Sequence, residues 1–149
     1  MIIWALAGGQ AEGAWRPGRK DFRELKVWQK AHPLTLAVYA ATRRFPREEL
    51  YGLTSQLRRS SSSIAPNLAE GCGRGSDADF AHFCWRAMGS ASELESLLLL
   101  ARDLGLLDSQ PSPDLDAATT EGKRMLAGLL QKLTADGSNT GPRPRSALS

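Results

Sequence analysis

Apolar residues recur every three or four positions along most of the chain between residues 21 and 133. This period is typical of helices that turn one face toward a core. No stretch in this region alternates apolar and polar residues over the length of a strand, and no internal repeat is visible. The pattern therefore predicts an all-α fold built from four helical segments.

The first segment keeps its apolar stripe from residue 27 to residue 45, and Pro46 ends it. Pro33 lies within the stripe, where a proline removes a backbone donor and clashes with the preceding turn. Two alternatives remain open: the helix begins near Ala31, or it begins earlier and is kinked at Pro33. The expected core positions are Val27, Ala31, Leu34, Val38, Ala41 and Phe45.

The second segment contains QLRRSSSSIAPNLAEG (residues 56–71), which has the composition of a linker. An apolar or small residue nevertheless recurs through it at helical spacing, and tertiary packing commonly overrides the weak helix propensity of serine. We therefore expect a helix that ends at Gly71. Pro66 predicts a bend, because the carbonyl of Ser62 loses its donor, and the hydroxyls of Ser62 or Ser63 are expected to support the loosened backbone. The expected core positions are Leu50, Leu53, Leu57, Ser61, Ile64 and Leu68.

The third and fourth segments carry clear helix ends. Ser76, with Asp79 three residues later, predicts an N-terminal cap, and Gly105 predicts a left-handed C-terminal residue. Ser112 as cap and Pro113 at the first helical position predict the start of the fourth helix. The third core stripe is Phe80, Cys84, Ala87, Ala91, Leu94, Leu98 and Ala101, and the fourth is Leu115, Ala118, Gly122, Met125, Leu129 and Leu133.

Short connections between the four helices predict an antiparallel, up-down-up-down four-helix bundle. We expect one domain over residues 21–133. Residues 1–20 and 134–149 are rich in Gly, Pro and Ser and show no apolar period, so they are expected to be a disordered N-terminal arm and a disordered C-terminal tail.

Composition and charge say more about the cellular compartment of the protein than about its function. The formal net charge is only +3, so an argument for nucleic acid has to rest on local clusters. The two cysteines form no CxxC pair, which favours a reducing compartment. No apolar run reaches the length of a membrane span, so we expect a soluble, cytoplasmic protein without membrane contact.

The candidate catalytic and ligand-binding motifs are weak. Gly71–Gly75 (GCGRG) follows an expected helix and lacks the GK[ST] sequence of a phosphate-binding loop, so an interhelical turn is favoured. Asp79 and His82 share one helix face that points away from the core, and a di-metal bundle site needs more ligands than these. Cys84 lies on the core stripe. We therefore expect no catalytic residue, metal, cofactor or small-molecule substrate.

Arginines form the strongest local clusters, at Arg43, Arg44 and Arg47, at Arg58 and Arg59, and at Arg74. One interpretation is a solvated face whose arginines pair with Glu48, Glu49 or Glu70. The other is a phosphate-binding surface, because the planar guanidinium group suits phosphate oxygens. The spacing alone leaves both open.

Large apolar residues also recur off the core stripes of the first and third segments, at Leu36, Tyr39, Trp85, Met88 and Leu99. A helix that is apolar nearly all round is usually buried all round. We therefore predict that other copies of the chain cover these residues in a homo-oligomer.

Four stretches together resemble a known family: FRELKVWQKAH (22–32), FPREELYGLTSQLRRSSSSIAPNLAEG (45–71), GSASELE (89–95) and ARDLGLL (101–107). They look like the four-helix-bundle proteins encoded in intervening sequences of bacterial 23S rRNA genes. That family is similar to the accessory protein of diversity-generating retroelements, a pentameric barrel that works with a reverse transcriptase and nucleic acid. The resemblance implies a ring-like, pentameric homo-oligomer with a non-enzymatic role near RNA or a ribonucleoprotein.

The signature of this family falls on Tyr51, Gly52, Leu53, Gln56, Leu57, Arg58, Arg59, Pro66, Asn67, Ala69, Glu70 and Gly71. No catalytic residue transfers with it. The chain departs from the family in its more polar Ser60–Ser63, in Cys72 where an aromatic residue is common, and in its extra N-terminal arm. The resemblance also implies that Asn67 ties the expected bend to a neighbouring helix.

These observations favour an oligomeric helical scaffold that binds RNA or a ribonucleoprotein through Arg43, Arg44, Arg47, Arg58, Arg59 and Arg74 by neutralising phosphate charge. The alternative is a protein-interaction module whose arginines are structural. A metal-dependent enzyme is the third and least favoured class.

Overall fold

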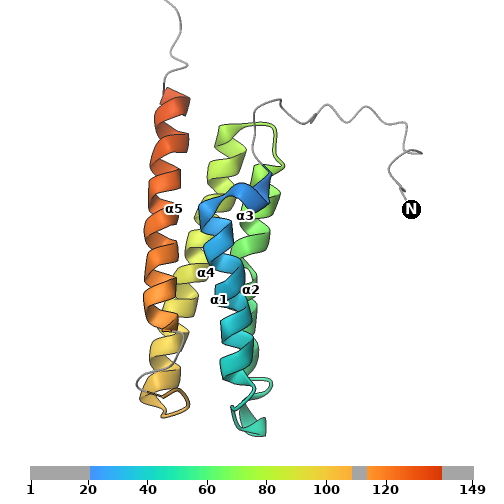
Figure 1. Ribbon diagram of the computed structural model, residues 1–149, viewed down its shortest axis with the longest axis vertical. Helices are drawn as coiled ribbons and strands as arrows, with labels where there is room; N and C mark the ends of the chain where they lie inside the picture. The colour runs from blue at the N-terminus through green and yellow to red at the C-terminus, as the bar shows by residue number, and fades with distance from the viewer. Residues whose placement is uncertain (1–20, 109–113, 139–149) are drawn as a thin grey trace, which may run out of the picture.

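A computed structural model describes residues 21–108 and 114–138 of the chain (Figure 1). Every regular element in these ranges is helical, which confirms the all-α fold. The α-helices are α1 (Lys26–Thr42), α2 (Leu53–Ser62), α3 (Ile64–Cys72), α4 (Asp77–Asp103) and α5 (Leu115–Ser138), and two short 3-10 helices, η2 (Phe22–Glu24) and η3 (Arg47–Glu49), precede α1 and α2.

The helices pack as four rods, because α2 and α3 follow one another along the same side of the molecule (Figure 1). The rod α1 contacts α2, α3 and α5, and α4 contacts the same three helices. Among the described residues α1 does not pack against α4, nor α5 against α2 or α3. The helices α1 and α4 are therefore diagonal to each other across the core.

The expected core stripes of the first and third segments are confirmed in large part. In α4 all seven expected positions are buried. In α1 the stripe is buried from Val27 to Val38, whereas Ala41 and Phe45 are only half-buried and Thr42 takes the buried position. In the second segment Leu53, Leu57, Ser61, Ile64 and Leu68 are buried, but Leu50 is exposed because it precedes α2.

The expected stripe of the fourth helix is correct only at Leu115. The buried positions of α5 are Leu115, Thr119, Leu126 and Leu130, and the other residues expected in the core are half-buried at its flank. Thr119 can be buried because its hydroxyl donates to the carbonyl of Leu115 at 2.7 Å. The helix continues to Ser138, past the expected end at Leu133.

The predicted cap of this helix at Ser112 and Pro113 lies outside the described residues, as does the predicted N-terminal arm (1–20). Asp114 caps α5 instead, because its carboxylate accepts the N–H of Ala117 at 3.1 Å. The N-terminal cap of α4 is confirmed, since Ser76 Oγ accepts the N–H of Asp79 at 3.1 Å. At the other end Gly105 has φ 76°, which confirms its left-handed conformation.

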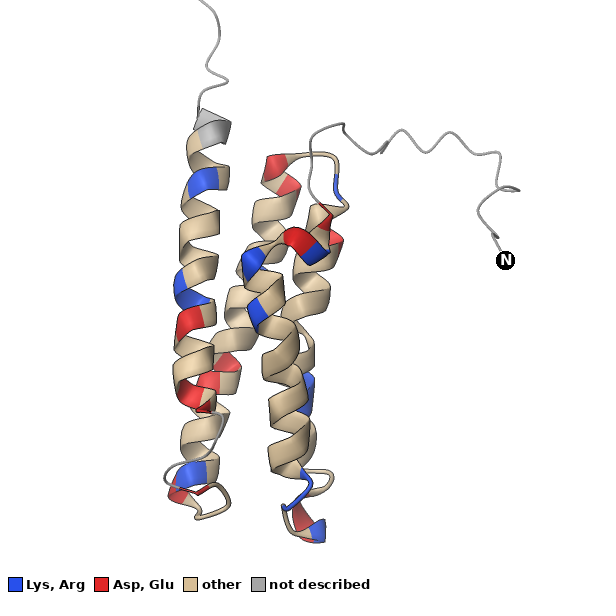
Figure 2. Ribbon diagram, in the orientation of Figure 1, with Lys and Arg blue, Asp and Glu red and all other residues tan. Residues whose placement is uncertain are grey.

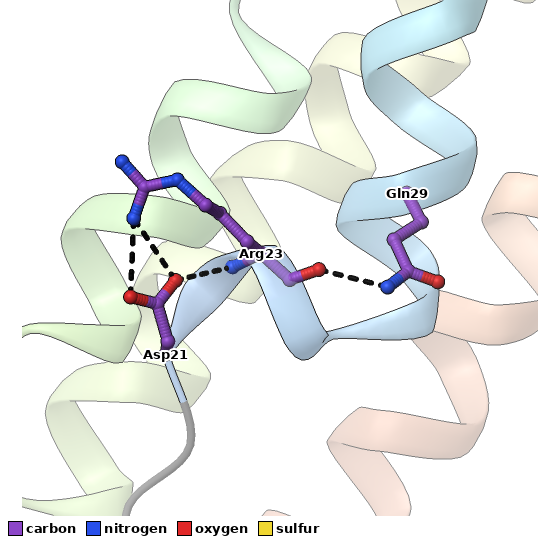
Figure 3. Close-up of polar contacts among 3 residues, drawn as sticks. All are labelled: Asp21, Arg23 and Gln29. Atoms are coloured by element: carbon purple, nitrogen blue, oxygen red, sulfur yellow. Dashed lines mark hydrogen bonds and ion pairs between the residues drawn. The ribbon is translucent and has the colours of Figure 1, made fainter.

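The first helix begins at Lys26, so Pro33 lies inside α1 and the alternative start near Ala31 is wrong. The turn before it is fastened by polar contacts (Figure 3). Asp21 accepts the N–H of Arg23 at 2.8 Å and pairs with its guanidinium group, while Gln29 Nε2 donates to the carbonyl of Arg23 at 2.8 Å. These contacts fix η2 against the start of α1.

The serine-rich run is helical, as predicted. Each of its four hydroxyls donates to the carbonyl three residues earlier, at 3.0–3.2 Å. This local bonding satisfies the hydroxyl groups, so that Ser60 and Ser61 can be fully buried. The same bonding loosens helices, and Pro66 leaves the carbonyl of Ser62 without a backbone donor, so the rod is interrupted at Ser63, where the proline was expected to bend it.

Side chains of neighbouring helices hold this interruption in place. Thr35 of α1 donates through its hydroxyl to the carbonyl of Ser61 at 2.9 Å, and the hydroxyls of Ser63 and Ser90 are hydrogen-bonded at 2.6 Å. Within the described ranges Asn67 does not make the expected link to another helix. Its side-chain amide donates to the carbonyl of Ser63 at 2.7 Å, because that carbonyl lies one turn earlier in the same segment.

Gly71 lies in the last turn of α3 and does not end the helix, which continues to Cys72. Its φ is not positive, so its importance is spatial. A Cβ atom at this position would lie 2.7 Å from Cβ of Phe83 and 2.8 Å from Cδ2 of Phe80. Only glycine therefore lets α3 approach α4 this closely.

We expect Gly71→Ala to destabilise the fold by about 1–3 kcal/mol, the usual range for overpacking a core. The reason is that Cβ of Phe83 is fixed to the backbone of α4 and cannot move aside. Urea unfolding followed by circular dichroism measures the effect. Gly128→Ala is the matched control, because a Cβ there meets nothing within 4 Å and should stabilise α5 by roughly 0.5–1 kcal/mol. Equal stability of the two variants would contradict this interpretation of Gly71.

Candidate nucleic-acid interface

The arginines predicted to bind nucleic acid lie at different places in the fold. Arg43, Arg44 and Arg47 belong to the connection between α1 and α2, Arg58 and Arg59 to α2, and Arg74 to the connection between α3 and α4. These two connections lie at opposite ends of the bundle (Figure 1). The structure therefore does not join all six arginines into one surface.

Four of them gather at one end of the bundle, and we call Arg43, Arg44, Arg47 and Arg58 the end cluster. The helix α1 ends at Thr42, so Arg43 and Arg44 follow directly after its C-terminus, where positive charge is favourable. Both side chains are exposed, as is Arg47 in η3. Among the described residues these three make no ion pair.

Arg58 reaches this end from the neighbouring helix. Its Nε donates to Oγ1 of Thr42 at 2.9 Å, and its guanidinium carbon lies 4.9 Å from the ring centroid of Tyr39. The hydroxyl of Thr42 in turn donates to the carbonyl of Val38 at 2.8 Å. These contacts hold the guanidinium group of Arg58 against the last turn of α1, beside Arg43.

Two acidic residues lie within the same connection, and Figure 2 shows blue and red segments together there. The carboxylate of Glu49 already has a hydrogen-bond partner. Its Oε2 accepts the N–H of Leu53 at 3.1 Å and so caps α2. Glu48 is exposed. Four arginines against these two carboxylates leave the end of the bundle positively charged.

The remaining two arginines pair within the chain. Arg59 lies 3.5 Å from a carboxylate oxygen of Glu93 on α4. Arg74 pairs with Glu70 at 3.0 Å and lies 4.9 Å from the ring centroid of Phe83. The solvated interpretation therefore fits Arg59 and Arg74, although exposed pairs of this kind contribute little to stability.

The residues predicted to form an oligomer interface divide between two helices. Leu36 and Tyr39 on α1 and Trp85 and Leu99 on α4 are exposed, by 40–60% of their surface. Met88 is an exception, since it is half-buried and packs against the core. Because α1 and α4 are diagonal across the core, the two pairs belong to different sides of the bundle.

Further apolar residues are exposed that the sequence analysis did not assign to an interface. Leu100 lies on α4, Leu104 follows directly after it, and Leu50 and Tyr51 lie just before α2. Tyr51 is 94% exposed. Leu100 belongs to the continuous apolar run Leu97–Leu100, in which the sequence does not distinguish the exposed position. Tyr51 lies between two helical segments, where helical spacing makes no prediction of burial.

Only some of the family-signature residues belong to the core. Tyr51, Gln56, Pro66 and Glu70 are exposed, Gly52 and Asn67 are half-buried, and Gly71 is buried. Packing within one chain therefore explains Gly71 and leaves the exposed signature residues without a role in the core.

A cavity of about 10 Å³ lies among α1, α3, α4 and α5, with small residues such as Ala31, Ala118 and Gly122 in its lining. Its volume is that of about one water molecule, which is too small for a substrate. Among the described residues no group of three or more His, Cys, Asp or Glu side chains is arranged to hold a metal ion. No helix in the described ranges is long and apolar enough to span a membrane.

The two cysteines are buried and do not form a disulfide with each other. Burial, with a smaller contribution from the nearby Cys72, raises the pKa of the Cys84 thiol to about 12. A thiol with this pKa carries almost no thiolate at neutral pH, so Cys84 is unsuited to nucleophilic catalysis.

Two comparisons bear on these observations. The sequence model of one family, described as the 23S rRNA-intervening sequence protein, matches residues 23–128. The matched range includes both connections that carry arginines. Among curated proteins no relative matches the chain.

We expect Cys84 to resist alkylation by iodoacetamide at pH 8 in the folded protein, because its thiol is both buried and protonated. Mass spectrometry of the intact chain and of its peptides measures the labelling. After unfolding in urea both cysteines should react quickly, which is the positive control. Rapid labelling of native Cys84 would show that α4 opens at this position.

Proposed function

Because the chain belongs to the family of 23S rRNA-intervening sequence proteins, we propose that it is a non-enzymatic helical scaffold that assembles into a ring and binds RNA or a ribonucleoprotein. The end cluster is the binding surface of this scaffold. Arginine side chains neutralise phosphate charge there, and the protein performs no chemistry on the RNA.

One observation carries the proposal. The end cluster presents exposed Arg43, Arg44 and Arg47 that form no ion pair among the described residues, together with an Arg58 that Thr42 and Tyr39 hold in position. Arginines that are already paired gain less from a phosphate, because binding must first break the existing pair. The proposed surface therefore excludes Arg59 and Arg74 and is smaller than the sequence suggested.

The proposed assembly rests on the two exposed apolar pairs. The unit is an antiparallel up-down-up-down bundle, an arrangement supported by the colour gradient of Figure 1, in which successive rods run in alternating directions. Leu36 and Tyr39 face one side, and Trp85 and Leu99 face another. Unlike faces on one subunit favour head-to-tail contacts, which form a ring when the rotation between neighbouring subunits closes. The family resemblance suggests a pentamer.

The second candidate is a protein-interaction module without nucleic-acid contact. The pairs Arg59–Glu93 and Arg74–Glu70 favour it, because they show arginines of the family signature and the adjoining turn in structural roles. This candidate predicts a bound protein that remains after nuclease treatment. RNA that co-purifies with the chain and is lost on nuclease treatment favours the scaffold.

We expect the double variant Arg43→Glu, Arg44→Glu to bind a short fluorescein-labelled RNA more weakly, as measured by fluorescence anisotropy. Each lost phosphate contact to a single strand lowers the log-log salt slope by about 0.7, so two lost contacts lower it by roughly 1.4. The matched control is Arg86→Glu with Arg124→Glu, two exposed positions outside the end cluster with the same change in charge. Equal weakening in both double variants would show that the change in net charge alone explains the effect, which would contradict the proposed surface.

We expect Trp85→Glu to dissociate the assembly into helical monomers, because a carboxylate would replace an apolar side chain in a subunit contact. Size exclusion with light scattering measures the subunit number, and circular dichroism verifies the helices. Arg124→Glu provides the control with an introduced carboxylate on another helix. An assembly that is unchanged by Trp85→Glu would disprove the assigned face.

A further inference from the structure

Tyr51 is the most exposed large hydrophobic residue in the described part of the chain. It lies in the turn between η3 and α2, with 94% of its surface accessible, and its side chain makes no hydrogen bond or ring contact within the described part of the chain. Packing therefore does not explain an aromatic residue here. Both faces of the ring are open to a ligand.

The connection that carries this ring has an excess of basic residues. Arg47 lies four residues before Tyr51, and Arg43 and Arg44 belong to the same connection between α1 and α2, which also contains Glu48 and Glu49. Proteins that bind single-stranded nucleic acid combine these two features: a positive surface follows the phosphates, and aromatic rings stack on the bases. Glu49, the nearer acidic residue to this turn, is directed to the N–H of Leu53.

We propose that the turn around Tyr51 binds unpaired RNA, with a base stacked on the Tyr51 ring and the flanking phosphates on Arg43, Arg44 and Arg47. This inference rests on the proposed RNA-binding function and specifies its substrate class. The ligand is a single strand, a loop or a bulge, because bases inside an A-form duplex are stacked on one another and cannot reach a protein ring.

A second copy of the chain is a less suitable occupant. Contact between two such ends would bring the arginines of both copies together, which is unfavourable between like charges. The apolar pairs Leu36–Tyr39 and Trp85–Leu99 already supply faces for contacts between copies. Tyr51 also has only Leu50 as an exposed apolar neighbour in sequence.

The test compares an unstructured RNA with the same strand annealed to its complement, using the full chain and fluorescence anisotropy at fixed salt. Stacking on an aromatic ring contributes about 1–3 kcal/mol per base, so Tyr51→Ala should weaken single-strand binding by roughly 5- to 150-fold. Tyr51→Phe, which keeps the ring, should bind within about twofold of the wild type. Duplex binding and the salt slope should not change, because the phosphate contacts remain.

The outcomes separate this inference from the proposed function. If Tyr51→Ala binds the single strand as tightly as the wild type while Arg43→Glu with Arg44→Glu weakens it, the stacking site is wrong and the arginine surface stands. If the wild type binds neither RNA, the proposed function itself fails. If Tyr51→Ala lowers the subunit number in light scattering, Tyr51 is a contact between copies and the inference is overturned. Circular dichroism verifies that each variant is folded.

Discussion

The whole bundle depends on one constraint, which is that a polar, serine-rich segment must supply a wall of the core. A buried hydroxyl without a partner costs about 1–3 kcal/mol, and two of the serines are fully buried. The segment meets this constraint locally, because each hydroxyl donates to a carbonyl of its own helix. Thr35 and Ser90 then attach the segment to α1 and α4. The segment is therefore interrupted at Ser63, but α2 and α3 both remain packed against α1 and α4.

Helical spacing predicted most of three core faces, because their apolar and small residues recur at the intervals of a helix. It misplaced the face of α5, where the polar Thr119 is buried and the candidates Ala118 and Gly122 are only half-buried. Spacing alone placed the polar Ser61 in the core, whereas the burial of Thr119 depends on its hydrogen bond to the carbonyl of Leu115, which forms in the folded helix. The interruption of the second rod lies where the sequence predicted the bend. Pro66 leaves the carbonyl of Ser62 without a backbone donor, and the serine hydroxyls weaken the helix from Ser60 onward.

The candidate site was harder to predict than the fold. Clusters of arginine are visible in a sequence, but their partners depend on which helices lie side by side. Arg59 meets Glu93 only because α2 packs on α4, and Arg58 meets Thr42 only because α2 packs on α1. The exposure of Tyr51 likewise depends on the path of a turn. The sequence therefore indicated the chemistry of the surface, and the packing of the helices determined which groups remain available.

The bridge between Arg58 and Thr42 has a thermodynamic consequence. One guanidinium group fastens α2 to the final turn of α1 at the end of the bundle that also carries the exposed Arg43, Arg44 and Arg47. An anion that binds this guanidinium group away from the bundle competes with Thr42 for the Nε donor of Arg58, and so weakens the contact between α2 and α1. Anion binding at this end and the opening of the contact between Arg58 and Thr42 are then linked equilibria, so a bound anion would change the hydrogen-exchange protection of the last turn of α1.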